Sequence, residues 1–205
     1  MFGNVLKSAA GGFMICIGAV VYLSCDIKYI GAFLFSLGLF TICEFGLGLY
    51  TGKVGYLFLN GKSYWKEVLL TFFGNAVGTL ISGVMIYLAR PEIAQKAEVM
   101  CGLKLSQTPL QTLILSFFCG ILMFVAVDTY NNGLGIARYI ALFTAIPVFI
   151  LSGFEHSVAN MFYFFCSLTF GFDAVLFIFL CAVGNALGAA AAANFARNKK
   201  AHIEK

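Results

Sequence analysis

The sequence predicts an all-α membrane protein with six transmembrane helices. Three observations lead to this prediction: 61% of the 205 residues are hydrophobic, only 11% are charged, and the apolar residues gather in long runs. An ordinary soluble domain has roughly 45–50% apolar and about 25% charged residues. So much apolar surface needs lipid to cover it, so the composition excludes a soluble globular protein and a disordered chain.

Four runs without Asp, Glu, Lys or Arg are each long enough to cross a bilayer, which takes about 20 helical residues. These runs are 8–25, 68–89, 105–127 and 174–196. Lys7 precedes the first run as in a signal peptide, but no A-x-A cleavage site ends that run. We therefore interpret it as the first span.

Two further apolar regions, 29–61 and 139–172, are interrupted by ionisable residues. The interrupting residues are Glu44, Lys53, Glu155 and His156. The order along the chain is thus whole, interrupted, whole, and then the same again. Three crossings reverse the starting side, so two such halves have opposite orientations, and their broken second and fifth helices meet near the midplane. We predict a single transmembrane domain, 1–205, with inverted repeats at approximately 5–90 and 104–197.

A short motif occurs in both halves. Residues 74–78 read GNAVG and residues 184–188 read GNALG, each within an uninterrupted run. The glycines are typical of close helix packing in membranes. A buried Asn carboxamide needs hydrogen-bond partners, so we expect Asn75 and Asn185 to bond with backbone groups left unpaired where the interrupted spans unwind.

Basic residues predict the orientation in the membrane. Six crossings put both termini on one side, together with nine of the 13 basic residues: Lys7, Lys53, Lys62, Lys66, Arg138, Arg197, Lys199, Lys200 and Lys205. The other four are Lys28, Arg90, Lys96 and Lys104. Because basic residues concentrate in cytoplasmic segments, we predict a multi-pass protein of the cell inner (cytoplasmic) membrane with both termini cytoplasmic, including a short tail at 197–205. Nucleic acid is not an expected partner.

Ionisable residues inside spans are candidates for function, since centring a charge in the bilayer costs at least ~2.5–3.5 kcal/mol. His156 stands next to Glu155 in the second interruption, although a lone membrane histidine can also be an ordinary hydrogen-bonded core residue. Gly52 lies in the first interruption, where a positive φ would let the backbone turn. Unwound segments release amide groups and aim positive helix ends at the midplane, which suits a small anion. No CxxC or HExxH motif is present, so no metal or other cofactor is expected.

One string of residues resembles a known family. Residues 152–162, SGFEHSVANMF, closely resemble the signature of the formate/nitrite transporter family, and the stretches 35–39 and 49–52 resemble its broken second helix. The resemblance implies an aquaporin-like fold, assembled in the lipid bilayer as a homopentamer with one pore per protomer. It also implies passage of a small monovalent anion or its conjugate acid: formate, nitrite, hydrosulfide or a short-chain carboxylate such as acetate or lactate.

The resemblance also assigns roles to individual residues. His156 matches the central pore histidine and Thr51 the threonine that faces it. Lys104, at the entry of the fourth span, resembles the lysine that draws anions into the vestibule. Asn185 resembles the sixth-helix asparagine near the histidine. Aromatic and aliphatic residues resemble two constrictions: Phe35 and Phe149 on the external side, and Leu39, Leu49 and Tyr50 on the cytoplasmic side.

Two departures from the family pattern limit this transfer. Cys119 and Gly120 stand where many members carry Asn in the fourth span, which removes one polar contact near the pore. The amphipathic N-terminal helix of many members is not expected, because the first span begins within a few residues of Met1. Glu155 is expected to bond the backbone freed by the break and to hold His156 in place.

A narrow apolar passage imposes a large desolvation cost on an anion and a small one on its neutral acid. We therefore hypothesise proton-coupled passage. Lys104 and the positive helix ends concentrate the anion, whose proton affinity rises in the low dielectric between the constrictions. Water, or a network with His156 and Thr51, then supplies the proton.

Two alternatives belong to other classes. A neutral small-solute channel of the aquaporin or urea type is also compatible with an inverted repeat, although such channels usually have paired asparagines or an Arg at the constriction. An enzyme is not expected. The candidate nucleophile and base, Ser157 and His156, are adjacent in sequence and would point about 100° apart on a helix.

Overall fold

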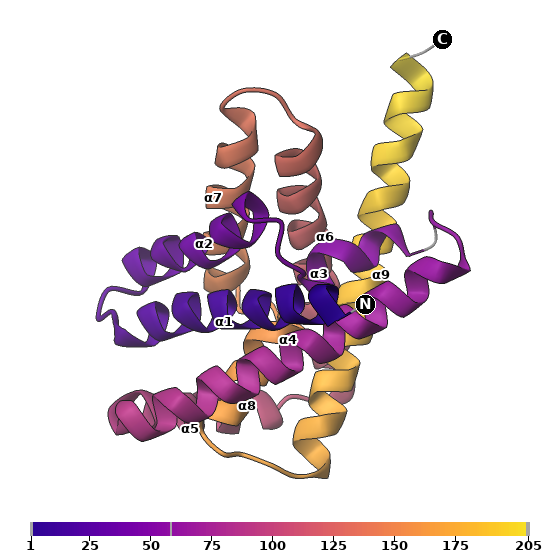
Figure 1. Cartoon of the computed structure of the whole chain (residues 1–205). Helices are drawn as coiled ribbons and strands as arrows, with labels where there is room; N and C mark the ends of the chain where they lie inside the picture. Colours follow the sequence, from indigo (N-terminus) through magenta and orange to yellow (C-terminus); the bar gives the residue numbers. More distant parts are fainter. Residues whose placement is uncertain (1, 58, 204–205) are drawn as a thin grey trace.

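The computed structural model describes residues 2–57 and 59–203, which are helical apart from short connections (Figure 1). The helices are α1 (Phe2–Ser24), α2 (Lys28–Glu44), α3 (Tyr50–Lys53), the 3₁₀ turn η1 (Val54–Tyr56), α4 (Lys62–Ala89), α5 (Pro91–Leu105), α6 (Pro109–Asn132), α7 (Ala137–Leu151), α8 (Ser157–Cys166) and α9 (Phe172–Ile203). The described part of the chain is therefore all-α, as predicted.

Within the described residues, four helices are long and apolar enough to cross a membrane: Gly3–Ser24, Ser63–Ala89, Pro109–Asn132 and Phe172–Ala196. They correspond to the four uninterrupted runs, so this part of the prediction is confirmed. The tail predicted at 197–205 begins within α9, which continues to Ile203. Residues 204–205 of that tail lie outside the described residues.

The fourth span begins later than the predicted 105–127. Thr108 caps α6, because its hydroxyl accepts a hydrogen bond from the Gln111 backbone N–H, and the Gln111 side chain accepts one from the Thr108 N–H. Pro109 then occupies the first helical position, where it suits a helix start.

Helix α5 has no counterpart among the predicted spans. It starts with Pro91 and carries Glu92 in its first turn, both of which are ordinary signals of a helix start. It packs on α8, α1 and α4 through buried residues at helical spacing: Ile93, Ala94, Ala97 and Cys101. Lys104 therefore lies in the last turn of α5 and not at the entry of the fourth span, because the chain turns between α5 and α6.

Close helix pairs build the core. α1 packs on α4, and α6 packs on α9 (Figure 1). A Cβ at Gly78 of α4 would lie 2.0 Å from the Ala9 carbonyl oxygen, and a Cβ at Gly188 of α9 would lie 1.9 Å from the Phe117 carbonyl oxygen. The glycines of the GNAVG and GNALG motifs are thus required for close packing, as expected.

Non-helical segments occupy 45–49, between α2 and α3, and 152–156, between α7 and α8. A glycine in the left-handed region turns the chain in each: Gly46 with φ +57° and Gly153 with φ +68°. The expectation that Gly52 would make this turn is wrong, because Gly52 is helical within α3. Gly46 follows Phe45, the C-cap of α2, and a left-handed glycine at this position commonly terminates a helix.

Candidate functional site

One cavity lies beside the connection that precedes α6, and a second lies near the C-terminal end of α6. The Lys104 cavity has a volume of about 220 Å³, and its polar lining residues are Tyr22, Lys104, Gln107, Glu155, His156, Asn160 and Tyr163. The Lys53 cavity has a volume of about 310 Å³ and is lined by residues that include Cys43, Leu49, Gly52, Lys53, Tyr56, Tyr64, Val127 and Asn131.

Thr51 and His156 join the two interrupted regions between these cavities. Thr51 Oγ1 lies 2.9 Å from His156 Nε2, and both residues are buried. His156 lines the Lys104 cavity, whereas Gly52, the neighbour of Thr51, lines the Lys53 cavity. This polar pair therefore separates the two cavities.

His156 also caps α8. Its Nδ1 accepts a hydrogen bond from the Ala159 N–H at 3.1 Å. A ring nitrogen that accepts has no hydrogen, so the neutral imidazole has its hydrogen on Nε2 and donates it to Thr51 Oγ1. A second proton would lie on Nδ1 and face the Ala159 N–H. The cap therefore favours the neutral ring.

Apolar side chains adjoin this pair. The rings of Phe35 and Phe149 meet edge to face with centroids 6.0 Å apart, and the Phe149 centroid is 5.7 Å from that of His156. Leu39 lies about one turn after Phe35 on α2 and is buried, and Leu49 lines the Lys53 cavity. The structure thus brings Phe35 and Phe149 together beside His156.

Tyr50 lies on another side of α3. Its hydroxyl donates to the Ala182 carbonyl of α9 at 3.0 Å, and its ring packs on Phe72 with centroids 5.0 Å apart. Tyr50 lines an apolar cavity of about 370 Å³ between α4 and α9, whereas Leu49 lines the Lys53 cavity. The structure therefore does not bring Tyr50 to the same cavity as Leu49, because consecutive residues at a helix start point in different directions.

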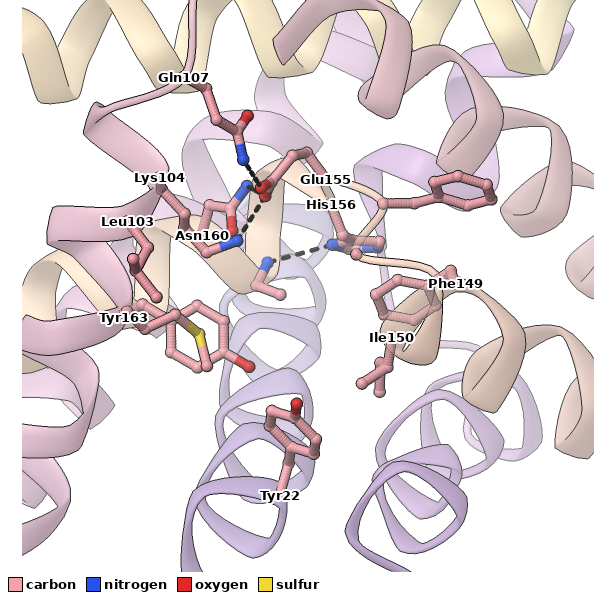
Figure 2. Close-up of a pocket in the computed structure, with 14 residues that line it drawn as sticks. Tyr22, Leu103, Lys104, Gln107, Phe149, Ile150, Glu155, His156, Asn160 and Tyr163 are labelled. Carbon is pink, nitrogen blue, oxygen red and sulfur yellow. Dashed lines mark hydrogen bonds and ion pairs between the residues drawn. The ribbon is translucent and has the colours of Figure 1, made fainter. Parts of the chain in front are cut away.

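Lys104 and Glu155 form a partly buried ion pair in the Lys104 cavity (Figure 2). Lys104 Nζ lies 2.5 Å from Glu155 Oε2, and the side chains are 13% and 3% exposed. Gln107 Nε2 donates to Oε1 at 2.8 Å, and Asn160 Nδ2 donates to Oε2 at 2.9 Å. Within the described residues, the carboxylate bonds these three side chains and not the freed backbone that we expected from the sequence. A buried carboxylate needs several such donors to offset its desolvation.

Asn185 ties the 152–156 segment to the neighbouring spans. Its Oδ1 accepts from the Ser157 N–H at 2.9 Å, and its Nδ2 donates to the carbonyls of Glu155 at 2.8 Å and Ser116 at 2.9 Å. Asn185 therefore holds the backbone on both sides of His156.

Asn75 makes the corresponding contacts at the 45–49 segment. Its Oδ1 accepts from the Tyr50 N–H at 2.8 Å, and its Nδ2 donates to the carbonyls of Gly48 at 2.8 Å and Ser8 at 2.7 Å. Both asparagines are fully buried. The prediction that Asn75 and Asn185 bond to backbone freed in the interrupted regions is confirmed.

Four polar residues of the Lys104 cavity have no predicted role: Tyr22, Gln107, Asn160 and Tyr163. Asn160 follows His156 by four residues, so helical spacing indicates that the two lie on one face. Gln107 lies in the connection after α5, and Tyr22 lies near the end of α1. Their approach to α8 depends on how distant helices pack, which local patterns do not indicate.

The four membrane-length helices and the buried polar pair between two cavities define an integral membrane protein with a polar site in its interior. The family model described as "Formate/nitrite transporter" matches residues 2–197. The chain therefore belongs to the formate/nitrite transporter family.

Curated relatives carry names from this family. The chain is 27% identical over 150 residues to "Formate channel FocA" of Escherichia coli (strain K12), covering 66% of this chain and 52% of that protein. It is 26% identical over 138 residues to "Nitrite transporter NirC" of the same strain, covering 62% of this chain and 52% of that protein. The matches thus span about half the length of these relatives. Both relatives are named as a channel or a transporter, not as enzymes.

Two solved structures share the fold. "FNT family ion channel" superposes with a TM-score of 0.82 and 20% identity, covering 92% of this chain and 86% of that one. "Pentameric formate channel with formate bound" superposes with a TM-score of 0.76 and 21% identity, covering 98% of this chain and 96% of that one.

Proposed function

We propose that this protein is a transmembrane channel or transporter for a small monovalent anion or its conjugate acid, with flux coupled to protons. The substrate class comprises formate, nitrite, hydrosulfide and short-chain carboxylates. The observation that supports the proposal most strongly is the Thr51–His156 pair, which lies buried between two cavities beside the Phe35 and Phe149 rings. Family membership supports the same reading.

The proposed architecture has six crossings in two inverted repeats, approximately 5–90 and 104–197, within a single domain. The second and fifth helices are broken in this proposal. The matched contacts of Asn75 and Asn185 support it, because each asparagine bonds one N–H and two carbonyls in the corresponding half. The packing of α1 on α4 and of α6 on α9 also supports it.

In the cell, the proposed assembly is a homopentamer in the inner membrane with both termini cytoplasmic. Exposed apolar residues along the spanning helices, among them Phe73, Phe118 and Phe179, support burial in lipid or against further copies. An apolar cavity of about 440 Å³ between α4, α8 and α9 adds to the apolar surface that lipid or further copies would cover. The excess of basic residues on the terminal side supports the orientation.

In the proposed mechanism, the anion first enters the Lys104 cavity. The Lys104 ammonium has three N–H groups, and the structure uses one for Glu155. Gln107 and Asn160 hold the Glu155 carboxylate, so the ammonium stays at the cavity wall with N–H groups available for an anion.

The second step is passage past the aromatic rings as a neutral acid, because apolar walls disfavour a bare anion. Thr51 accepts a hydrogen bond from His156, which leaves the Thr51 hydroxyl hydrogen for the passing species. The cap at Nδ1 supports a role in which His156 orients Thr51 while water in the cavity supplies the proton.

Proteoliposome uptake of formate, nitrite and hydrosulfide over a pH series tests the proposal. We expect His156→Phe and Lys104→Ala to lower uptake strongly, and the exposed Lys28→Ala variant to behave like the wild type. Thr51→Val should lower uptake and Thr51→Ser should restore it. Uptake unchanged by both His156→Phe and Lys104→Ala would contradict the mechanism.

Two further readouts separate the alternatives. Uptake that ignores the proton gradient would indicate an anion channel without proton coupling. Osmotic swelling with glycerol or urea, together with no anion uptake, would indicate a neutral-solute channel instead.

A further inference from the structure

Two tyrosine hydroxyls in the Lys104 cavity have no part in the mechanism above. Tyr163 of α8 is only 5% exposed, and Tyr22 of α1 is partly buried. Both line the cavity, and Figure 2 shows their hydroxyls directed into the space between Leu103 and Ile150. Within residues 2–57 and 59–203, neither hydroxyl has a hydrogen-bond partner.

Each hydroxyl is therefore a hydrogen-bond donor at the cavity wall that the described residues do not use. The nearby walls are apolar and include Met100, Leu103 and Ile150. A molecule bound in this cavity has both hydroxyls available as hydrogen-bond donors.

The remaining polar groups of the cavity favour an acceptor of negative charge. Lys104 Nζ lies 5.8 Å from the centroid of the Tyr163 ring, and both residues line this cavity. Both Glu155 oxygens and His156 Nδ1 already accept hydrogen bonds from protein donors. The cavity therefore offers unused donors, while these strong acceptors are occupied.

We propose that Tyr22 and Tyr163, together with Lys104, form an oxyanion-binding site in this cavity and determine specificity for carboxylates and nitrite over hydrosulfide. Two hydroxyl donors match the two oxygen atoms of a carboxylate or of nitrite. Sulfur is a weak hydrogen-bond acceptor, so hydrosulfide gains little from the tyrosines. This inference rests on the proposed function and narrows its substrate class.

Tyrosine-to-phenylalanine variants test the inference, because they remove the hydroxyl and keep the packed ring. We expect Y22F/Y163F to raise the half-saturation concentration for formate and nitrite uptake about tenfold, with a smaller change in maximal rate. Hydrosulfide uptake should stay within about twofold of the wild type. Tyr87→Phe, at an exposed site on α4, is the matched control and should change nothing. Equal formate kinetics in the double variant and the wild type would overturn the inference, as would a parallel loss of hydrosulfide uptake.

Binding is measured separately from transport, as the formate-dependent rise in Tm of the detergent-solubilised protein against sodium chloride at equal ionic strength. Ligand binding to the folded state raises Tm. We expect a rise for the wild type and a reduced rise for Y22F/Y163F. No formate-dependent rise in the wild type, or an equal rise in the double variant, would overturn the inference. A wild-type rise that needs the tyrosines but occurs without any anion uptake would support this site and contradict the proposed function.

Discussion

Replacing Asn185 with leucine removes three buried hydrogen bonds to the backbone at once and keeps the number and branching of side-chain heavy atoms. The variant leaves the Ser157 N–H and the carbonyls of Glu155 and Ser116 without their side-chain partner. A side-chain hydrogen bond between membrane helices stabilises by roughly 0.6–2 kcal/mol, and an unsatisfied buried group costs about 1–3 kcal/mol. Since such terms are not additive, we expect Asn185→Leu to lower the free energy of unfolding by about 2–5 kcal/mol.

Thermal unfolding in detergent measures this effect, with the folded fraction after heating determined by size-exclusion chromatography. At about 2–4 °C per kcal/mol for a chain of this size, the expected fall in Tm is roughly 5–20 °C. Asn75→Leu should lower Tm by a similar amount, because Asn75 makes three matching bonds. Asn132→Leu is the control, since the Asn132 side chain is exposed and donates a hydrogen bond to Asp128 at the end of α6.

A Tm for Asn185→Leu within about 2 °C of the Asn132→Leu control would refute the reasoning, because it corresponds to less than about 1 kcal/mol for three buried bonds. The same preparation should lose uptake in liposomes, since Asn185 holds the backbone on both sides of His156.

Three further predictions concern packing, charge and the aromatic rings. Gly188→Ala should greatly reduce the yield of folded protein, because its Cβ would lie 1.9 Å from the Phe117 carbonyl oxygen, while Gly102→Ala, with open space at its Cβ, should be recovered at the wild-type level or above. Glu67→Gln removes the charged partner of Lys53 in an ion pair whose side chains are 30% and 40% exposed. The free energy of unfolding, measured from Tm in detergent, should therefore fall by no more than about 1 kcal/mol, and by less in high salt. Phe149→Ala opens the ring contact with Phe35 and should weaken the pH dependence of anion uptake in liposomes; a pH profile identical to the wild type, at equal folded protein, would argue against a neutral-acid barrier at this position.

Local sequence patterns were sufficient to predict the features that contact with lipid requires, above all the membrane spans. A span must satisfy its backbone internally and expose apolar side chains, so runs without charge identify it directly. The contacts of Asn75 and Asn185 were predictable for a related reason. A carboxamide in an apolar span needs polar partners, and the interrupted regions provide them.

Helix α5 was missed by the sequence analysis, which predicted only membrane spans. It has the start signals of a helix, Pro91 and Glu92, but its charged residues exclude it from a search for spans. Its presence moves Lys104 from the entry of a span to the end of a separate helix, which packs on α8.

By itself, the sequence determined the all-helical class, the four uninterrupted spans and the residues around which the candidate site forms. Only the tertiary structure decided the partners of those residues. Lys104 meets Glu155 across 51 residues of chain, Thr51 meets His156 across 105, and Tyr50 turns to α9 across 132. The physical reason is that these contacts depend on the register and crossing of whole helices, which the packing of many side chains sets together, whereas solvation by lipid acts on each run of residues separately.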